Sequence, residues 1–470
     1  MKSHLIPIFC AAAACGILAG CASVPKDAGF KDVQRLTTDR TGLVVEWNSH
    51  TTDDQSVAAK IREMLTHDLT AEQAAQIALL NNHHLQATLE DLGIAQADLV
   101  QAGLLKNPVF DLGVRFPDRS PAATYLDIAV AEDFLDIALL PARKKLAAGE
   151  FEAAKARVSD EVLTLVAETQ SDFYAYQAAR QMADLRRTIA QSAAASLEIT
   201  KKLHDAGNVT DMDFANERAQ NTRAKIDLAD AEASATEARE KLTEQMGLWG
   251  ADINWKAVSQ LPGIPSHDLQ SANLESLAIR QRQDLAAARE EVIVQARTLG
   301  LTADYSFASE LNVGPEFEHE TDGQWRIGPT VSVPIPLFDQ GQAKIARAQA
   351  LLRQSHERYL ALEVDVRSEV RMALSRLSIA RNKAMLYHDE VLPAQKDVFQ
   401  QTQLEYNGMY TGVFQLLAAR RDQVDAASEL IASLRDYWMA RADLQRAVGG
   451  RLPESNSSPT TQNSIDGETP

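Results

Sequence analysis

The amino-acid sequence predicts an α+β membrane protein in which short pairs of β-strands alternate with very long helices. Three observations predict this fold class. Two regions alternate strictly between apolar and polar residues, two others run for dozens of residues almost without helix breakers, and sequence motifs recur at a spacing of about 200 residues. The chain therefore has two similar halves, each predicted to contain a helix, two strands, a long helix, a tight turn and a returning helix.

The N-terminus has the features of a signal peptide over residues 1–20, with Lys2 followed by an apolar run. That run is too short to cross a bilayer as a helix, which needs about 20 apolar residues. The sequence Leu18-Ala19-Gly20-Cys21 is typical of a bacterial lipobox and predicts lipidation of Cys21. Ala22, rather than Asp, follows the cysteine and favours the outer membrane. The alternative is an ordinary cleavage site with a chance cysteine.

The composition excludes several classes of function. A net charge of −18 argues against nucleic-acid binding, which needs clustered Lys and Arg. Cys21 is the only cysteine after the signal peptide, so no disulfide, thiolate metal site or cysteine nucleophile is available. The common hydrolase, metalloprotease and phosphate-loop motifs are absent, and adjacent His83 and His84 would face different ways on a helix. We expect no enzyme, no cofactor and no metal site.

An internal repeat organises the rest of the chain. Residues 77–79 recur as residues 277–279, an offset of 200, and Gly207 recurs as Gly408, an offset of 201. The predicted segments are, in order, a lipidated segment at 21–68, a first repeat at 69–250, a linker at 251–272, a second repeat at 273–450 and a disordered tail at 451–470. Residues 26–66 carry no clear pattern.

The helical hairpins are predicted at 141–248 and 340–449. Pro141 is expected to open a helix that meets no further proline before Leu203, a length of roughly 95 Å. Pro393 should kink the second long helix. The first returning helix shows a heptad of small residues, which would let a neighbouring backbone approach closely: Ala215, Ala219, Thr222, Ile226, Ala229, Ala233 and Thr236.

The β-hairpins are predicted at 107–134 and 303–337. Their alternating apolar positions are Phe110, Leu112, Val114, Phe116, Leu126, Ile128, Val130, Tyr305, Phe307, Leu311, Val313, Phe317, Trp325, Ile327, Val331, Val333 and Ile335. Strands of about ten residues are long enough to cross a membrane. A soluble two-layer sheet also alternates and stays as an alternative, whereas a free coiled-coil bundle does not explain the strands.

Edge closure predicts the oligomer. Four strands cannot form a closed barrel, since the smallest known has about 8, and lipid does not tolerate open edges. Three copies of a four-stranded unit would supply a 12-stranded barrel, wide enough for an aqueous channel. A homotrimer therefore follows if the strands lie in the bilayer.

Residues 69–450 resemble the TolC family of outer-membrane efflux proteins, in its lipoprotein branch. The resemblance rests on the duplicated order, the lipobox, the turns at 205–213 and 406–414, and the C-terminal stretch 434–450. It implies a homotrimer, with a 12-stranded barrel in outer-membrane lipid continued by a coiled-coil tunnel through the periplasm. It also implies a periplasmic adaptor and an inner-membrane transporter of the RND type, with drugs, solvents or metal ions as cargo. Type I protein secretion and a lipid-tethered scaffold without a pore are the alternatives.

The resemblance also implies roles for the two turns. Adaptor docking is expected on Gly207, Thr210, Asp211, Gly408, Thr411 and Gly412. Glycine favours the left-handed conformation that ends many helices, and Asp211, with Thr210 beside it, is a suitable cap for the returning helix. Asp213 and Tyr406 match family positions that close the tunnel. Gln415 and Ala418 stand where acidic residues are expected, so a carboxylate ring at the second turn is in doubt.

Overall fold

The computed structural model describes residues 23–25, 27–48, 52–116, 118, 123–265, 273–305 and 311–453. The predicted signal peptide, Cys21 and the predicted tail from residue 454 onward lie outside the described residues. The chain forms two compact units, each built from segments that are distant in sequence. The first unit draws on residues 1–33, 87–158 and 283–362, and the second on residues 34–86, 159–282 and 363–470.

Helices account for most of the described chain. The helices are α2 (Phe30–Thr41), α3 (Thr52–Leu65), α4 (Ala71–Asn81), α5 (His83–Ala102), α6 (Phe134–Asp205), α7 (Asp211–Gln245), α8 (Leu274–Gln281), α9 (Gln283–Tyr305), α10 (Gln342–Leu386), α11 (Leu392–Asn407) and α12 (Val413–Val448), with a 3₁₀ turn η1 (Gly250–Ile253) and a π turn η2 (Tyr387–Val391). The strands are β1 (Asp68–Leu69), β2 (Val109–Arg115), β3 (Tyr125–Asp133), β4 (Lys256–Ala257), β5 (Asn312–His319) and β6 (Trp325–Ser332).

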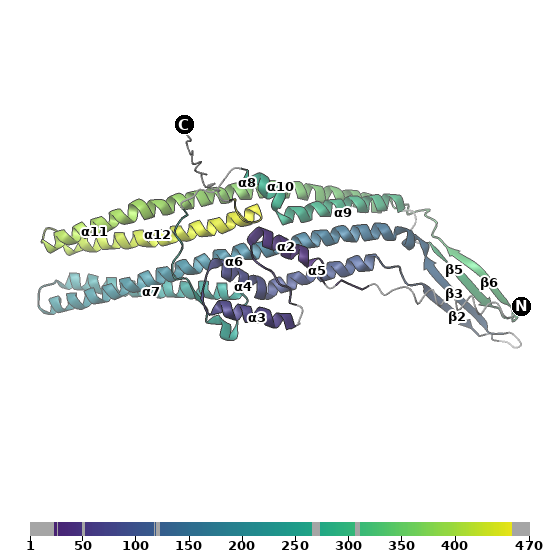
Figure 1. The fold of residues 1–470 in the computed structure, drawn as a ribbon, viewed down its shortest axis with the longest axis horizontal. Helices are drawn as coiled ribbons and strands as arrows, with labels where there is room; N and C mark the ends of the chain where they lie inside the picture. Colours follow the sequence, from purple (N-terminus) through teal and green to yellow (C-terminus); the bar gives the residue numbers. More distant parts are fainter. Residues whose placement is uncertain are drawn as a thin grey trace, which may run out of the picture. The chain divides into compact units, whose positions relative to one another are not determined.

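The first unit contains an antiparallel sheet with the strand order β2-β3-β5-β6 (Figure 1). Its register places Ile128 opposite Phe317, and Phe317 opposite Ile327. The two hairpins predicted from the sequence therefore pair with each other through β3 and β5. β2 and β6 are the edge strands, and each has one backbone side that pairs with no other strand of the described chain.

The sheet has one apolar and one acidic face. Because side chains alternate along a strand and paired residues share a face, the register assigns each residue to a side. The apolar face carries Phe110, Leu112, Val114, Leu126, Ile128, Val130, Val313, Phe317, Trp325, Ile327 and Val331, with Glu132 and His319 as its two polar exceptions. The opposite face carries Asp111, Arg115, Asp127, Asp133, Glu316, Glu318, Arg326 and Thr330. The alternation predicted from the sequence is present in the sheet.

The second unit contains two long helical hairpins. In the first, α7 returns alongside α6, and Arg187 of α6 lies 2.9 Å from the carboxylate of Glu232. Nearer the other end, the Lys241 ammonium lies 2.7 Å from Asp172. In the second hairpin, α12 returns alongside α11 (Figure 1).

The predicted small-residue seam of α7 is not the stripe that packs inside the chain. Ala215, Ala219 and Ala229 are exposed, and Ile226 is 56% exposed. The buried positions in this part of α7 are instead Glu217, Asn221, Ala224 and Ala231. Several stripes of an alanine-rich helix can satisfy a heptad, so periodicity alone does not identify the face that packs within the chain.

A hydrophobic core in the second unit is centred on Trp255. Its indole N–H donates to Thr243 Oγ1 at 3.0 Å, and the guanidinium of Arg239 lies 4.1 Å from the centre of its ring. Arg239 also donates to the carbonyl oxygens of Ile253 and Trp255, at 2.8 and 2.7 Å. These contacts hold the segment after α7 against α7 itself, and the same core includes the fully buried Phe173 of α6.

Two expected boundaries are wrong. The helix α6 begins at Phe134, and Pro141 lies inside it rather than at its first position. The physical reason is Asp133: its Oδ1 accepts from the N–H groups of Leu135 and Asp136, so it caps the helix while ending β3. Tyr305, expected in a strand, is the last residue of α9, and its expected neighbour Phe307 lies outside the described residues.

The second long helix is interrupted beside Pro393, where the sequence predicted an interruption. Here the long helix contains the π turn η2, and Pro393 lies in the first turn of α11 directly after it. Proline lacks an N–H group, and its ring clashes with the preceding helical turn, so a widened turn accommodates it. Two helices, α2 and α3, also occupy much of the segment 26–66 that the sequence left unassigned.

Candidate functional site

The first hairpin tip joins α6 to α7 through residues 206–210. Gly207 has φ of +74°, the left-handed conformation expected there, and nothing would touch a Cβ at this position. The cap of α7 is Thr210, whose Oγ1 accepts from the Asp213 N–H at 3.1 Å and donates to Asp213 Oδ2 at 2.7 Å. Asp211, expected as the cap, lies in the first helical turn instead.

A histidine missed by the sequence analysis closes this tip. The Nε2 of His204 lies 2.7 Å from Asp211 Oδ1, and its ring stacks on Phe214 with centroids 4.8 Å apart. The hydrogen bond to Asp211 raises the pKa of the His204 imidazole above its ordinary value of 6.5. His204 joins the last turn of α6 to the first turn of α7. A histidine in the last turn of a predicted helix, seven residues before an aspartate, was the available signal.

The second hairpin tip, between α11 and α12, has a different backbone conformation. Gly408 has an ordinary φ of −81°, and the left-handed residue is Met409, with φ of 60°. The expectation of a left-handed glycine is therefore wrong here. The ring of Tyr410 lies over Gly408, so any side chain at residue 408 would meet it. Met409 is 93% exposed and Tyr410 is 88% exposed.

Capping and charge also distinguish the two tips. The cap of α12 is Gly412, which offers no side chain, and Thr411 precedes it. Asp205, Asp211 and Asp213 give the first tip an acidic surface, whereas residues 407–415 contain no charged side chain. The first tip is polar and closed by side chains, and the second is apolar and exposed.

The two predicted gate residues have different surroundings. Asp213 is half-buried, and its Oδ1 has no hydrogen-bond partner among the described residues. The Tyr406 side chain is 40% exposed, at the end of α11. No hydrogen bond joins the two side chains within the described part of this single chain.

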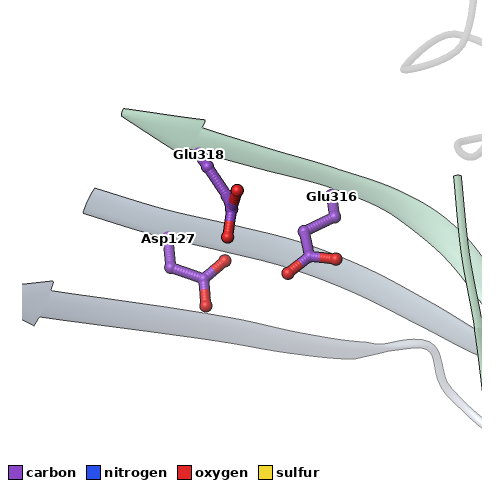
Figure 2. A group of neighbouring side chains, drawn as sticks. All are labelled: Asp127, Glu316 and Glu318. Atoms are coloured by element: carbon purple, nitrogen blue, oxygen red, sulfur yellow. The ribbon is translucent and has the colours of Figure 1, made fainter. Parts of the chain in front are cut away.

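A second group of polar residues lies on the acidic face of the sheet (Figure 2). Asp127 of β3 and Glu316 and Glu318 of β5 offer carboxylate oxygens within 4.8 Å of one another. Tyr125 donates to Glu318 at 2.7 Å, Thr330 donates to Glu316, and Asp127 Oδ1 is buried without a partner in the described chain. Carboxylate oxygens suit hard divalent cations, so this acidic triad is the arrangement in the described residues most suited to contact a metal ion.

Comparison with known proteins identifies the family. The sequence profile described as Outer membrane efflux protein matches residues 74–248 and 266–450. The chain belongs to this family. It is an outer-membrane efflux channel of the TolC kind and not an enzyme.

Individual relatives agree with this assignment. The cobalt-zinc-cadmium resistance protein CzcC of Cupriavidus metallidurans is 24% identical over 390 residues, which cover 81% of this chain and 90% of the relative. The crystal structure of a membrane protein from Pseudomonas aeruginosa has a TM-score of 0.70 at 18% identity, covering 81% of this chain and 92% of the other. The Campylobacter jejuni CmeC outer membrane channel has a TM-score of 0.70 at 17% identity, covering 82% and 86%. The structural matches show a shared fold.

None of the helices in the described residues combines the length and the apolar character that a membrane-crossing helix requires.

Proposed function

We propose that this efflux channel is the exit duct of a tripartite system that expels divalent transition-metal cations, driven by an inner-membrane transporter of the RND type through a periplasmic adaptor. The observation that carries the cargo assignment is the 24% identity to the cobalt-zinc-cadmium resistance protein, which extends over 90% of that relative.

The charge of the sheet supports a cationic cargo. Its acidic face carries five carboxylates and two arginines in the described strands: Asp111, Asp127, Asp133, Glu316, Glu318, Arg115 and Arg326. In a barrel whose apolar face meets lipid, this face would line the water-filled interior. A lumen of one sign of charge raises the local concentration of ions of the opposite sign. The acidic triad would then attract cations during their exit.

Two unpaired surfaces support a homotrimer. The edge strands β2 and β6 need partners if the sheet lies in lipid, and β2 of one copy beside β6 of the next would close a barrel of 12 strands. The exposed small-residue seam of α7 would accept a neighbouring helix in the coiled-coil tunnel. The match of one family profile to both halves supports the internal duplication.

The remaining assignments follow from the family. Cys21 would carry the lipid, and both hairpin tips would meet the adaptor. Asp213 and Tyr406 would link neighbouring coils in the closed tunnel. Planar-bilayer conductance tests the gate: Asp213→Ala and Tyr406→Phe should each raise conductance, and the pair should raise it further. Unchanged conductance in all three variants would exclude this gate.

Deletion and complementation test the cargo. A strain lacking this gene should become sensitive to cobalt, zinc and cadmium and keep its tolerance of dyes and organic solvents. Wild-type protein should restore tolerance, and the variant carrying Asp127→Asn, Glu316→Gln and Glu318→Gln should restore it only in part. Sensitivity to dyes and solvents without metal sensitivity would contradict the cargo assignment and leave the efflux function intact.

A further inference from the structure

A cavity of about 480 Å³ in the second unit lies between α8 and residues 367–374 of α10. Three arginines and one glutamate contribute the charges of its lining: Arg280, Arg367, Arg371 and Glu275. Arg371 lies 3.0 Å from Glu275, so these two charges offset each other. Among the residues that the structure describes, Arg280 and Arg367 have no hydrogen-bond or ion-pair partner. Arg280 and Arg367 are both exposed, so the cavity is an open groove with two solvent-facing positive charges, in a chain whose net charge is −18.

The first half of the chain shows that the fold does not need these charges. With the offset of 200 seen in the neighbouring helix, Arg280 aligns with Leu80, which is buried in the hydrophobic core. With an offset of 200 or 201, Arg367 aligns with Ala167 or Val166, and both are buried. Two buried apolar positions of the first repeat are thus exposed arginines in the second.

A smaller groove of the first half contains Val166 and Ala167 and is lined by other parts of the chain. It encloses only about 70 Å³, and its lining includes Arg40, Thr41 and Leu43 from the N-terminal part of the chain and Gly450 and Arg451 from the C-terminal end. Among the described residues, those that line the cavity beside α8 belong to α8 and α10, together with Asn273 before α8. Within the described part of the chain, no N-terminal or C-terminal segment lines this cavity.

We propose that this arginine cavity binds an oxyanion of phosphate chemistry. A guanidinium presents paired N–H donors in a plane that matches two oxygens of a phosphate, so arginine is well suited to this ligand. An anion in the cavity would be attracted by both Arg280 and Arg367. A cavity of this volume has room for a phosphate that is part of a larger molecule. Free phosphate and the headgroup of an anionic phospholipid share this chemistry.

Calorimetric titration of the purified full-length protein tests the proposal. The probe is inorganic phosphate, at an ionic strength held constant with sodium chloride. Wild-type protein should bind it saturably. Arg280→Gln and Arg367→Gln should each weaken binding by roughly tenfold, the loss of one charge-assisted interaction. Arg376→Gln is the matched control, since Arg376 is an exposed arginine of the same helix outside the cavity lining, and it should leave the affinity unchanged.

A second titration separates the two sources of the ligand. Tighter binding of glycerophosphoglycerol than of inorganic phosphate would identify a lipid headgroup, and the reverse order would identify free phosphate. Absence of saturable binding by either probe would overturn the site. An equal loss of affinity in Arg376→Gln would also overturn it, because nonspecific charge would then explain the binding. Loss of the oligomer in the two cavity variants, without phosphate binding by wild-type protein, would instead assign the cavity to a carboxylate of a neighbouring copy. None of these outcomes depends on the metal cargo.

Discussion

The two helical hairpins follow one plan but differ in their construction. In the first, α6 runs unbroken for 72 residues, a glycine makes the left-handed turn, and Thr210 caps the returning helix. In the second, the π turn and Pro393 interrupt the outgoing helix, and Met409 takes the left-handed conformation. The first tip is acidic and closed by side-chain hydrogen bonds, while the second exposes Met409 and Tyr410.

This difference shows that a shared plan leaves each hairpin free to acquire separate properties. A continuous α-helix resists bending, whereas π turns and prolines are the usual sites of kinks. We therefore expect bending to concentrate in the second hairpin. An exposed apolar tip and an acidic tip would also require different surfaces on a docking partner.

The largest expected loss of stability comes from placing a proline in the uninterrupted helix α6 of the first hairpin. The outgoing helix of the second hairpin already contains a π turn and Pro393. Ala194→Pro, at an exposed position of α6, should lower the free energy of unfolding by about 3 kcal/mol, because it removes the hydrogen bond to the carbonyl of Ala190 and its ring clashes with that turn. Pro393→Ala should change it by less than about 1 kcal/mol, since the first turn of α11 already tolerates proline. Urea unfolding of detergent-purified protein followed by circular dichroism measures both, and equal effects would contradict the comparison.

Substitutions at the left-handed residue of each tip should change the free energy of unfolding in opposite directions. Gly207→Ala places a Cβ on a left-handed residue and should destabilise the protein by about 1–2 kcal/mol. Met409→Gly relieves the same conformation and should stabilise by up to about 1 kcal/mol. The same urea titration applies, with Gly408→Ala as a separate check that Tyr410 occupies the space above residue 408. Destabilisation by Met409→Gly would show that the methionine side chain contributes contacts that outweigh its backbone strain.

Removing the helix cap of the first tip should lower the stability of the protein, and adding a capping side chain at the second tip should raise it. Thr210→Ala removes the acceptor for the Asp213 N–H and should cost about 1 kcal/mol, whereas Thr210→Ser should cost little. Gly412→Ser should add a few tenths of a kcal/mol by supplying a cap that α12 lacks. Thermal unfolding at fixed detergent concentration would rank these variants. An equal loss in Thr210→Ala and Thr210→Ser would place the effect elsewhere than the hydroxyl.

The smallest effect is the pH response of the first tip. The folded state raises the pKa of His204, so its bond to Asp211 stabilises the tip fully below pH 6.5 and loses that contribution as the pH rises through the folded-state value. The His204 ring resonances in a pH titration by NMR should show this raised value, and Asp211→Asn should shift it back toward 6.5. An unchanged titration in Asp211→Asn would exclude Asp211 as the main cause. The second tip has no histidine between residues 400 and 415, so it should show no matching response.

Most of the fold could be predicted because its signals are local. The alternating apolar residues Phe110, Leu112 and Val114 indicate a strand with one apolar and one polar face. The near absence of helix-breaking residues before the first tip indicates a long helix. The boundaries between strands and helices are harder to predict, because one residue can end a strand and cap the following helix. Asp133 both ends a strand and caps a helix, so the strand pattern hid the start of α6.

The candidate site was predicted only in part. Gly207 was predicted because a left-handed turn at a helix end favours glycine, whereas the cap was predicted at Asp211, one residue after the actual cap Thr210. His204 was missed because its partner, Asp211, lies across a turn. The acidic triad was missed because two of its members lie in a strand almost 190 residues from the third, and a carboxylate on a polar face has no distinctive local pattern.

By itself, the sequence determined the alternating strands, the lengths of the hairpins and the class of membrane protein, since these depend on backbone geometry and on side chains a few residues apart. Only the tertiary structure decided which stripe of α7 is buried, which residue of the second tip is left-handed, and that Arg280 and Arg367 line one open cavity. The physical reason is that burial, backbone strain and charge pairing depend on atoms brought together from distant parts of the chain, and their positions exist only once the chain has folded.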